Sequence, residues 1–105
     1  MALFGSKTRT DVLVTIARLD LTYPTEVARV LGLRLIEAQR AIVSLERDGI
    51  VISRLTGKTR NVSLNRRFSA SDELYTLLLK MSEEPSYGDR WAKLRRRPRA
   101  IGKRL

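Results

Sequence analysis

The side chains of this sequence that are best suited to chemistry are arginines and lysines, which recur close to glutamine, serine and threonine. Arginine can pair with guanine through two hydrogen bonds, glutamine can do the same with adenine, and both cations neutralise phosphates. The chain of 105 residues has 21 Lys and Arg against 11 Asp and Glu, a net charge of +10 and an isoelectric point near 11.1. This balance favours a polyanionic partner, and nucleic acid is the first candidate.

Catalytic chemistry has few suitable residues in this chain. It contains no cysteine and no histidine, which excludes disulfides, thiolate metal sites and a histidine proton shuttle. The sequence has no nucleophile–base pair, no metal-ligand cluster and no glycine loop that would bind phosphate. The adjacent carboxylates Glu83 and Glu84 are expected to be solvated. We therefore expect a protein that is not an enzyme and has no cofactor and no metal.

The length fits one small domain, and the charge divides it into two regions. Residues 1–84 have a net charge of +3, whereas residues 85–105 have a net charge of +7. The second region has little apolar periodicity, although Trp91, Ala92 and Leu94 could form a short helical turn. We therefore predict a folded domain over 1–84 and a basic tail over 85–105, which binds phosphates or is simply solvated.

Apolar periodicity predicts three helices at about 7–19, 25–31 and 35–48, the second of them opened by Pro24 and closed by Gly32. Runs of β-branched residues on either side of Gly57 predict a hairpin over 50–64. A last helix is expected to begin after a serine cap at Ser69 or Ser71. The expected fold class is mainly α with a small β-hairpin (α+β), in the order helix-helix-helix-hairpin-helix of a winged helix-turn-helix.

The third predicted helix is the element that would enter the major groove of a duplex. Its expected core stripe consists of Leu35, Ala38, Ile42 and Leu45. Its other side carries polar and basic residues, together with Ile36, Glu37 and Val43, and the hairpin adds further cations. The candidate DNA-binding residues are Arg34, Ile36, Gln39, Arg40, Ser44, Arg47, Arg54, Lys58, Thr59, Arg60, Arg95, Arg96, Arg97 and Arg99. For each of them, an ordinary solvated surface is the alternative interpretation.

Several short segments, in this order, resemble the signature of winged-helix transcriptional regulators of the arsenical-resistance repressor (ArsR)-like type. They are Glu26-Val27-Ala28, Leu31-Gly32-Leu33, Gln39-Arg40, Leu45-Glu46 and Asp48-Gly49-Ile50-Val51. The resemblance covers residues 3–82. It implies a dimeric repressor with the third helix in the major groove and the hairpin, as a wing, on the backbone. The chain departs from the pattern at Arg34, where relatives usually have Ser or Thr, and in lacking the Cys and His ligands of metal-sensing relatives.

The terminal segments are the expected dimer interface, because the last helix has more apolar surface than one small core requires. The alternative is that this stripe covers the core of its own chain. The candidate interface residues are Leu3, Phe4, Leu74, Tyr75, Leu77, Leu78 and Met81. A two-fold dimer would bind a palindromic site.

The function predicted from these observations is a double-stranded DNA-binding transcriptional regulator, a homodimer and most simply a repressor. Two alternatives stay open: a sequence-independent architectural DNA-binding protein, and a winged-helix module that binds other proteins. We expect no membrane association and a cytoplasmic, nucleoid-associated location, since no apolar run approaches the length of a membrane span and no signal peptide is present.

Overall fold

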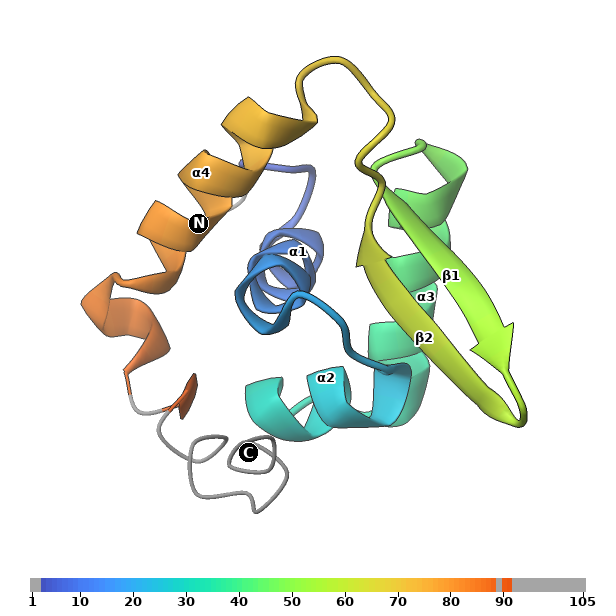
Figure 1. Cartoon of the computed structure of the whole chain (residues 1–105). Helices are drawn as coiled ribbons and strands as arrows, with labels where there is room; N and C mark the ends of the chain where they lie inside the picture. The colour runs from blue at the N-terminus through green and yellow to red at the C-terminus, as the bar shows by residue number, and fades with distance from the viewer. Residues whose placement is uncertain (1–2, 89, 92–105) are drawn as a thin grey trace, which may run out of the picture.

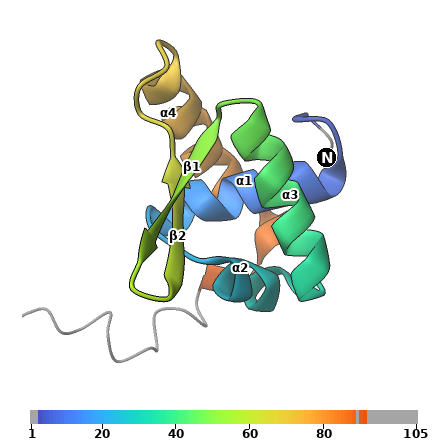
Figure 2. The ribbon, with the colours of Figure 1, turned by 90° about the vertical axis from the view of Figure 1, so that its right-hand side faces the viewer.

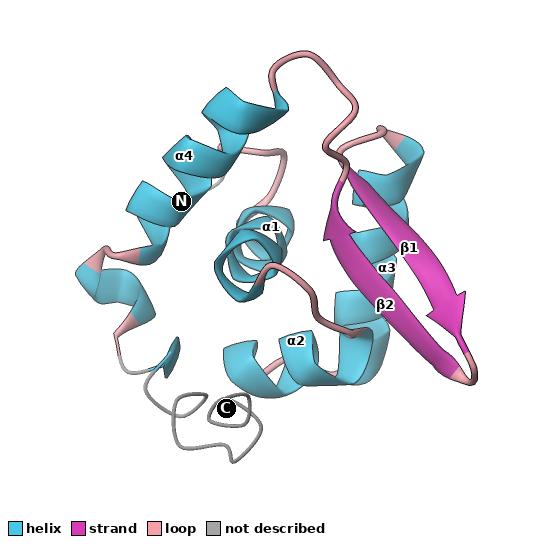
Figure 3. Cartoon of the chain, viewed as in Figure 1, coloured by secondary structure: helices cyan, strands magenta, loops and turns pink. Residues whose placement is uncertain are grey.

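The computed structural model describes residues 3–88, 90 and 91 and contains four α-helices and one two-stranded antiparallel sheet within them (Figures 1 and 3). The prediction of a mainly helical α+β chain with a single hairpin is confirmed. The elements follow one another as α1 (Lys7–Leu19), α2 (Pro24–Leu31), α3 (Leu35–Arg47), β1 (Val51–Thr56), β2 (Thr59–Leu64), α4 (Ser71–Ser82) and the short 3-10 helix η1 (Pro85–Tyr87).

Helix α1 lies at the centre of the molecule, between α4 on one side and α3 with the hairpin on the other (Figure 1). Ser6 caps it, since the serine hydroxyl accepts a hydrogen bond from the backbone N–H of Arg9 at 3.1 Å. Every residue from Val12 to Ala17 is buried, including Thr15, although helical periodicity from the apolar residues predicts that Thr15 faces solvent. A helix buried on all sides needs cover from several elements, and here α2, α3, α4 and β2 all contact it.

The short connection between α2 and α3 is built around Gly32, which has the left-handed conformation (φ 70°, ψ 32°) expected after a helix C-terminus. Pro24 opens α2, as the sequence predicts. In α3, Ala38, Ala41, Ile42 and Leu45 are buried. Leu35 is not: it is 44% exposed, so its placement in the core stripe was wrong. Periodicity gives the direction in which a residue points but not whether another element reaches its turn of the helix.

The hairpin is anchored at its base and exposed at its end. Val51, Val62 and Leu64 are buried in the core, and the chain before α2 pairs with the hairpin through two hydrogen bonds between Thr22 and Val62, at 2.7 and 3.0 Å. From Arg54 to Arg60 every residue is exposed. Gly57 takes the first position of the two-residue turn with φ 64°, whereas Lys58 keeps a negative φ, which is the pattern of a type II′ turn.

Helix α4 begins without the predicted serine cap. Its N-cap residue is Ala70, and Ser71 is a buried first helical residue whose hydroxyl donates to the backbone carbonyl of Arg66 at 3.2 Å. Asp72 and Glu73 do lie in the first turn, where their charges favour the helix dipole. The prediction of a cap at Ser69 or Ser71 was therefore wrong, because the Ser71 side chain turns back to the preceding loop.

The chain remains packed beyond Glu84, the residue at which the folded domain was predicted to end. Tyr87 and Trp91 are both buried and stack on each other, with 5.9 Å between ring centroids. We call this pair the C-terminal clasp. The indole Nε1 of Trp91 donates to the carbonyl of Ser82 at 2.7 Å, and the guanidinium of Arg18 lies over the indole ring at 5.7 Å. The folded part thus extends at least to Trp91.

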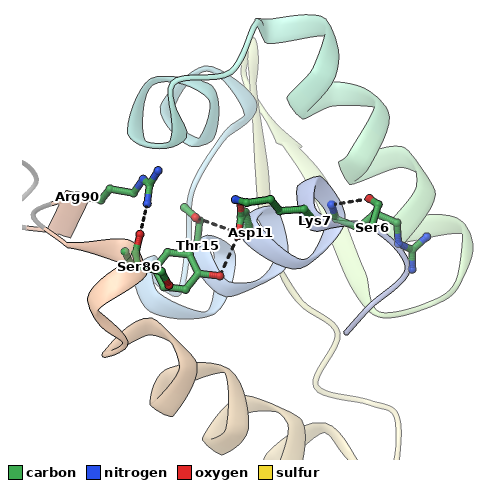
Figure 4. Close-up of polar contacts among 8 residues, drawn as sticks. Ser6, Lys7, Asp11, Thr15, Ser86 and Arg90 are labelled. Atoms are coloured by element: carbon green, nitrogen blue, oxygen red, sulfur yellow. Dashed lines mark hydrogen bonds and ion pairs between the residues drawn. The ribbon is translucent and has the colours of Figure 1, made fainter. Parts of the chain in front are cut away.

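The C-terminal clasp explains why α1 has no solvent-exposed side in its middle turns. The Tyr87 hydroxyl donates to Asp11 at 2.9 Å, and Figure 4 shows Asp11 facing the segment that carries Ser86 and Arg90. Burial, the hydrogen bond to Asp11 and the negative charges of Asp11 and Glu84 raise the pKa of Tyr87 well above its ordinary value, against the opposing effect of Arg90. Apolar residues that are sparse in the sequence can still complete a core when they are aromatic.

Candidate nucleic-acid interface

The outer face of α3 is the exposed surface on which the candidate residues are most concentrated. Because Ala38, Ile42 and Leu45 point inward, the opposite side of this helix points to solvent, on the side of the molecule that faces the viewer in Figure 2. A shallow depression of about 380 Å³ lies along it. Its lining residues are Ile36, Gln39, Arg40, Val43, Ser44 and Arg47.

Two aliphatic side chains on this face are unusually exposed: Ile36 at 45% and Val43 at 42%. They lie beside Arg40 and Arg47, and within the described part of the chain neither arginine forms an ion pair. Burying such a side chain from full exposure is worth about 1.5–3 kcal/mol, and less than half of each surface remains exposed here, so a partner that covers this face gains roughly 1 kcal/mol from each. Val43 was recognised in the sequence as outward-facing but was left out of the candidate residues.

The N-terminus of α3 is occupied by its own side chain. The carboxylate of Glu37 accepts a hydrogen bond from the backbone N–H of Arg34 at 3.0 Å and lies 3.6 Å from the Arg34 guanidinium. A carboxylate there stabilises the helix, as a capping box does, and it also takes the place that a phosphate would occupy. Arg34 remains highly exposed, but its charge is partly neutralised.

Ser44 is also used within the chain, since its hydroxyl accepts a hydrogen bond from the guanidinium of Arg9. The same guanidinium donates to Asp48 at 3.0 Å, and Arg9 Nε donates to the carbonyl of Phe4 at 2.8 Å. Arg9 therefore ties the N-terminus of α1 to the C-terminal half of α3. This role of Arg9 was not predicted from the sequence, because Ser44 and Asp48 lie more than 30 residues away along the chain.

Glu46 links α3 to the hairpin. Its carboxylate accepts a hydrogen bond from the Ser53 hydroxyl at 2.7 Å and lies 3.5 Å from the guanidinium of Arg60. Arg60, a candidate phosphate ligand, thus has an intramolecular partner. The two contacts fix the hairpin beside α3, in addition to the anchoring of its base.

The exposed end of the hairpin retains cations without an intramolecular partner. Arg54, Lys58 and Thr59 are exposed, and the described residues provide no ion pair for Arg54 or Lys58. Between Gly49 and Ser71 the sequence has five basic residues and no acidic one. A hydrogen bond from the Asn61 amide to Thr56 at 3.1 Å crosses the hairpin near its turn. The end of the hairpin is therefore both ordered by hydrogen bonds and uniformly positive.

One exposed residue near the end of the hairpin was not among the candidates predicted from the sequence. Leu55 is 72% exposed, more than any other large hydrophobic residue in the described part of the chain. Strand alternation places it on the same face as the buried Val51. The hairpin extends past the core, however, so that this face becomes solvent-exposed at Leu55.

The predicted basic arm cannot be placed, because Arg95, Arg96, Arg97 and Arg99 lie outside the described residues. Seven of the 21 Lys and Arg residues of the chain fall in residues 92–105, which contain no Asp or Glu. The segment therefore keeps its phosphate-binding potential as a matter of composition.

The expected dimer interface is largely used by the chain itself. Leu78 and Met81 are buried in the core, and Phe4, Leu74 and Tyr75 are partly buried against it. Leu3 and Leu77 are the two expected interface residues that remain exposed. The apolar stripe of α4 faces α1 because α1 needs cover on that side, so the surplus of apolar surface inferred from the sequence is much smaller than expected.

Comparisons of the chain with models of protein families, with characterised proteins and with solved structures find no significant match. Among the helices in the described part, none combines the length and the apolar content required to cross a lipid bilayer.

Proposed function

We propose that this chain is a winged helix-turn-helix protein that binds double-stranded DNA and regulates transcription, most simply as a repressor of the kind that the ArsR-like resemblance implies. In this proposal α2, the turn at Gly32 and α3 are the helix-turn-helix, and β1 with β2 is the wing. The observation that carries the proposal is the outer face of α3, where Arg40 and Arg47 form no ion pair with any described residue and lie beside two exposed aliphatic residues.

The dimensions and chemistry of this face suit the major groove. A groove about 12 Å wide admits one α-helix, and the 13 residues of α3 span roughly 20 Å at 1.5 Å per residue. Arg40 is suited to guanine and Gln39 to adenine. Ile36 and Val43 offer aliphatic contact to thymine methyl groups. Their exposure, which is unfavourable in the free protein, then contributes to binding.

Phosphate contacts are assigned to the cations around this face. Arg54 and Lys58 on the hairpin are exposed and unneutralised, whereas Arg34 and Arg60 are partly neutralised by Glu37 and Glu46. Residues 92–105 contribute seven further Lys and Arg by composition. Contacts of this type supply affinity and fix the register but do not read the sequence.

The proposal is tested by DNA binding at several salt concentrations, followed by selection of bound sequences from a random duplex pool. If 6–10 phosphates are neutralised, affinity should fall by about 10³–10⁵ between 50 and 200 mM salt. A selected motif that competes better than random DNA indicates a regulator. Strong, salt-dependent binding without a motif would replace it with an architectural DNA-binding protein.

A protein partner is the second candidate, and the exposure of Ile36 and Val43 is the observation that favours it. Absence of any mobility shift at low salt would reject DNA and leave this alternative. The proposal requires only one chain, because the apolar stripe of α4 packs against the core. A two-fold symmetric selected motif, together with a dimer in analytical ultracentrifugation, would show that two copies of the chain bind the site.

A further inference from the structure

We infer that Leu55 is an apolar wedge that the hairpin inserts into the DNA minor groove, so that binding bends the duplex. This inference rests on the proposed function and adds a property to it, namely deformation of the DNA. It starts from the position of one residue: the most exposed large hydrophobic residue in the described part of the chain lies in a segment, between Gly49 and Ser71, that has basic residues and no acidic one.

The surroundings of Leu55 identify its partner by charge. Arg54 precedes it, Arg60 lies directly opposite on β2, and Lys58 is in the turn. Arg60 is partly neutralised by Glu46, whereas Arg54 and Lys58 are exposed and form no ion pair among the described residues, so a partner that approaches the end of the hairpin meets two free cations, which favours a polyanion. The minor groove of DNA provides two lines of phosphates with an apolar sugar wall between them, and proteins that bend DNA frequently insert Leu, Ile, Phe, Met or Pro there.

A wedge must also be held firmly, because a mobile side chain cannot transmit a force to a base step. The hairpin fulfils this condition through its buried base, the pair of hydrogen bonds between Thr22 and Val62, and the contacts of Ser53 and Arg60 with Glu46. Two of these contacts come from α3, so the wedge is fixed relative to the helix that would lie in the adjacent major groove.

The end of the hairpin is small, so it can lead the hairpin into a minor groove that widens as the duplex bends. The turn has only Gly57 and Lys58 between the strands, and Gly57 has no neighbouring atom within 4 Å of the position that a side chain would take. Leu55 is the second residue before that turn. When the hairpin enters and widens the groove, Leu55 follows the turn into it and can separate adjacent base pairs.

The experiment measures the bend directly. A duplex of roughly 30 bp with a flexible TA step, labelled at its two ends with donor and acceptor dyes, is titrated with the full-length chain at 50 mM salt. We expect energy transfer to rise on binding, in keeping with the bends of about 20–90° that such wedges produce. Circular permutation of the site in a gel assay gives an independent measure.

The variants separate the wedge from simple loss of affinity. L55A should bind with the same dependence on salt but leave the duplex straight, and L55M should retain the bend. Leu21 is similarly exposed but lies before α2, so L21A serves as a matched control and should bend DNA like the wild type. Since Leu55 lies outside the core, unfolding curves should coincide for all of these proteins.

Two results overturn the inference while leaving DNA binding intact: wild-type protein that binds without a change in energy transfer, or L55A that bends the duplex as the wild type does. A wild-type protein that binds no duplex even at low salt overturns the proposed function, and the wedge with it. The two failures are therefore distinguishable in the same titration.

Discussion

The aromatic residues Tyr87 and Trp91 are buried, hydrogen-bonded and covered by cations, whereas α3 leaves Ile36 and Val43 in solvent beside two arginines that form no ion pair with any described residue. Both regions combine apolar with basic residues. They differ in whether the chain supplies the cover itself. The comparison teaches that an apolar residue beside a cation is no sign of a binding surface by itself; the sign is that nothing in the chain covers it.

Removal of the C-terminal clasp should have the largest effect on the free energy of unfolding. A chain that ends at Glu84 loses both residues of the C-terminal clasp, and large-to-small changes of buried aromatics cost about 3–5 kcal/mol each, so its free energy of unfolding should fall by at least that much. A chain that ends at Leu94 keeps both residues and lacks the remaining basic positions. It should unfold like the full chain in urea and show a smaller salt dependence of DNA binding. Equal stability of the two truncated chains would show that the clasp does not contribute.

Substitution of Arg40 by alanine tests the exposed side. We expect R40A to lose about 1–3 kcal/mol, or roughly 5-fold to 150-fold, at the selected site and much less on random DNA, because a bidentate base contact discriminates by that amount. Its unfolding midpoint should not move, since the side chain is exposed and has no ion pair among the described residues. Lys80 on α4 is the matched control: K80A should affect neither property. Equal loss on both DNAs would assign Arg40 to a phosphate instead.

The high pKa of Tyr87 makes a prediction about pH on the buried side. In the unfolded chain the phenol ionises near its ordinary pKa of 10.0, whereas in the folded chain burial and Asp11 keep it protonated. The unfolded state therefore loses its proton first, and the free energy of unfolding should decrease as pH rises above about 10. Y87F should lose about 1 kcal/mol at neutral pH, from the missing hydrogen bond, and should fall less steeply above pH 10. Parallel curves for the two proteins would contradict this account.

The smallest expected effect concerns Glu37, which caps α3. E37Q removes a negative charge from the N-terminus of α3, where the proposed binding mode brings a DNA phosphate close. Because a surface charge interaction is worth roughly 0.5–1 kcal/mol, affinity for any duplex should increase about twofold to fivefold. The amide can still accept the hydrogen bond from Arg34, and helicity should be nearly unchanged. A decrease in affinity would indicate that the carboxylate itself contacts the DNA, for example a cytosine amino group.

Sequence patterns located the helices and the hairpin to within about one residue, because helical periodicity, Pro24, Gly32 and Gly57 act locally. They failed where the outcome depends on a distant element. Thr15 is buried because the C-terminal clasp returns over α1, and Leu35 is exposed because the core ends before it. Neither fact is encoded within one turn of helix.

The candidate site was found in part for the same reason. Types and spacing identified Gln39, Arg40 and Arg47, which are exposed together on α3. They could not reveal which candidates have partners within the chain. Ser44 pairs with Arg9 and Arg60 with Glu46 only after folding, and Arg34 pairs with Glu37 only after the helix forms. Leu55 was missed because the length of the hairpin relative to the core has no sequence signature.

The position of Trp91 gives the molecule a built-in spectroscopic reporter. It is the one tryptophan of the sequence, it is buried, and its hydrogen-bond, stacking and cation–π partners, Ser82, Tyr87 and Arg18, all lie outside α3. Its fluorescence emission should shift to longer wavelength when the chain unfolds, yet remain unchanged when a ligand covers the outer face of α3. Folding and binding can therefore be followed in one cuvette, without a dye attached to the protein.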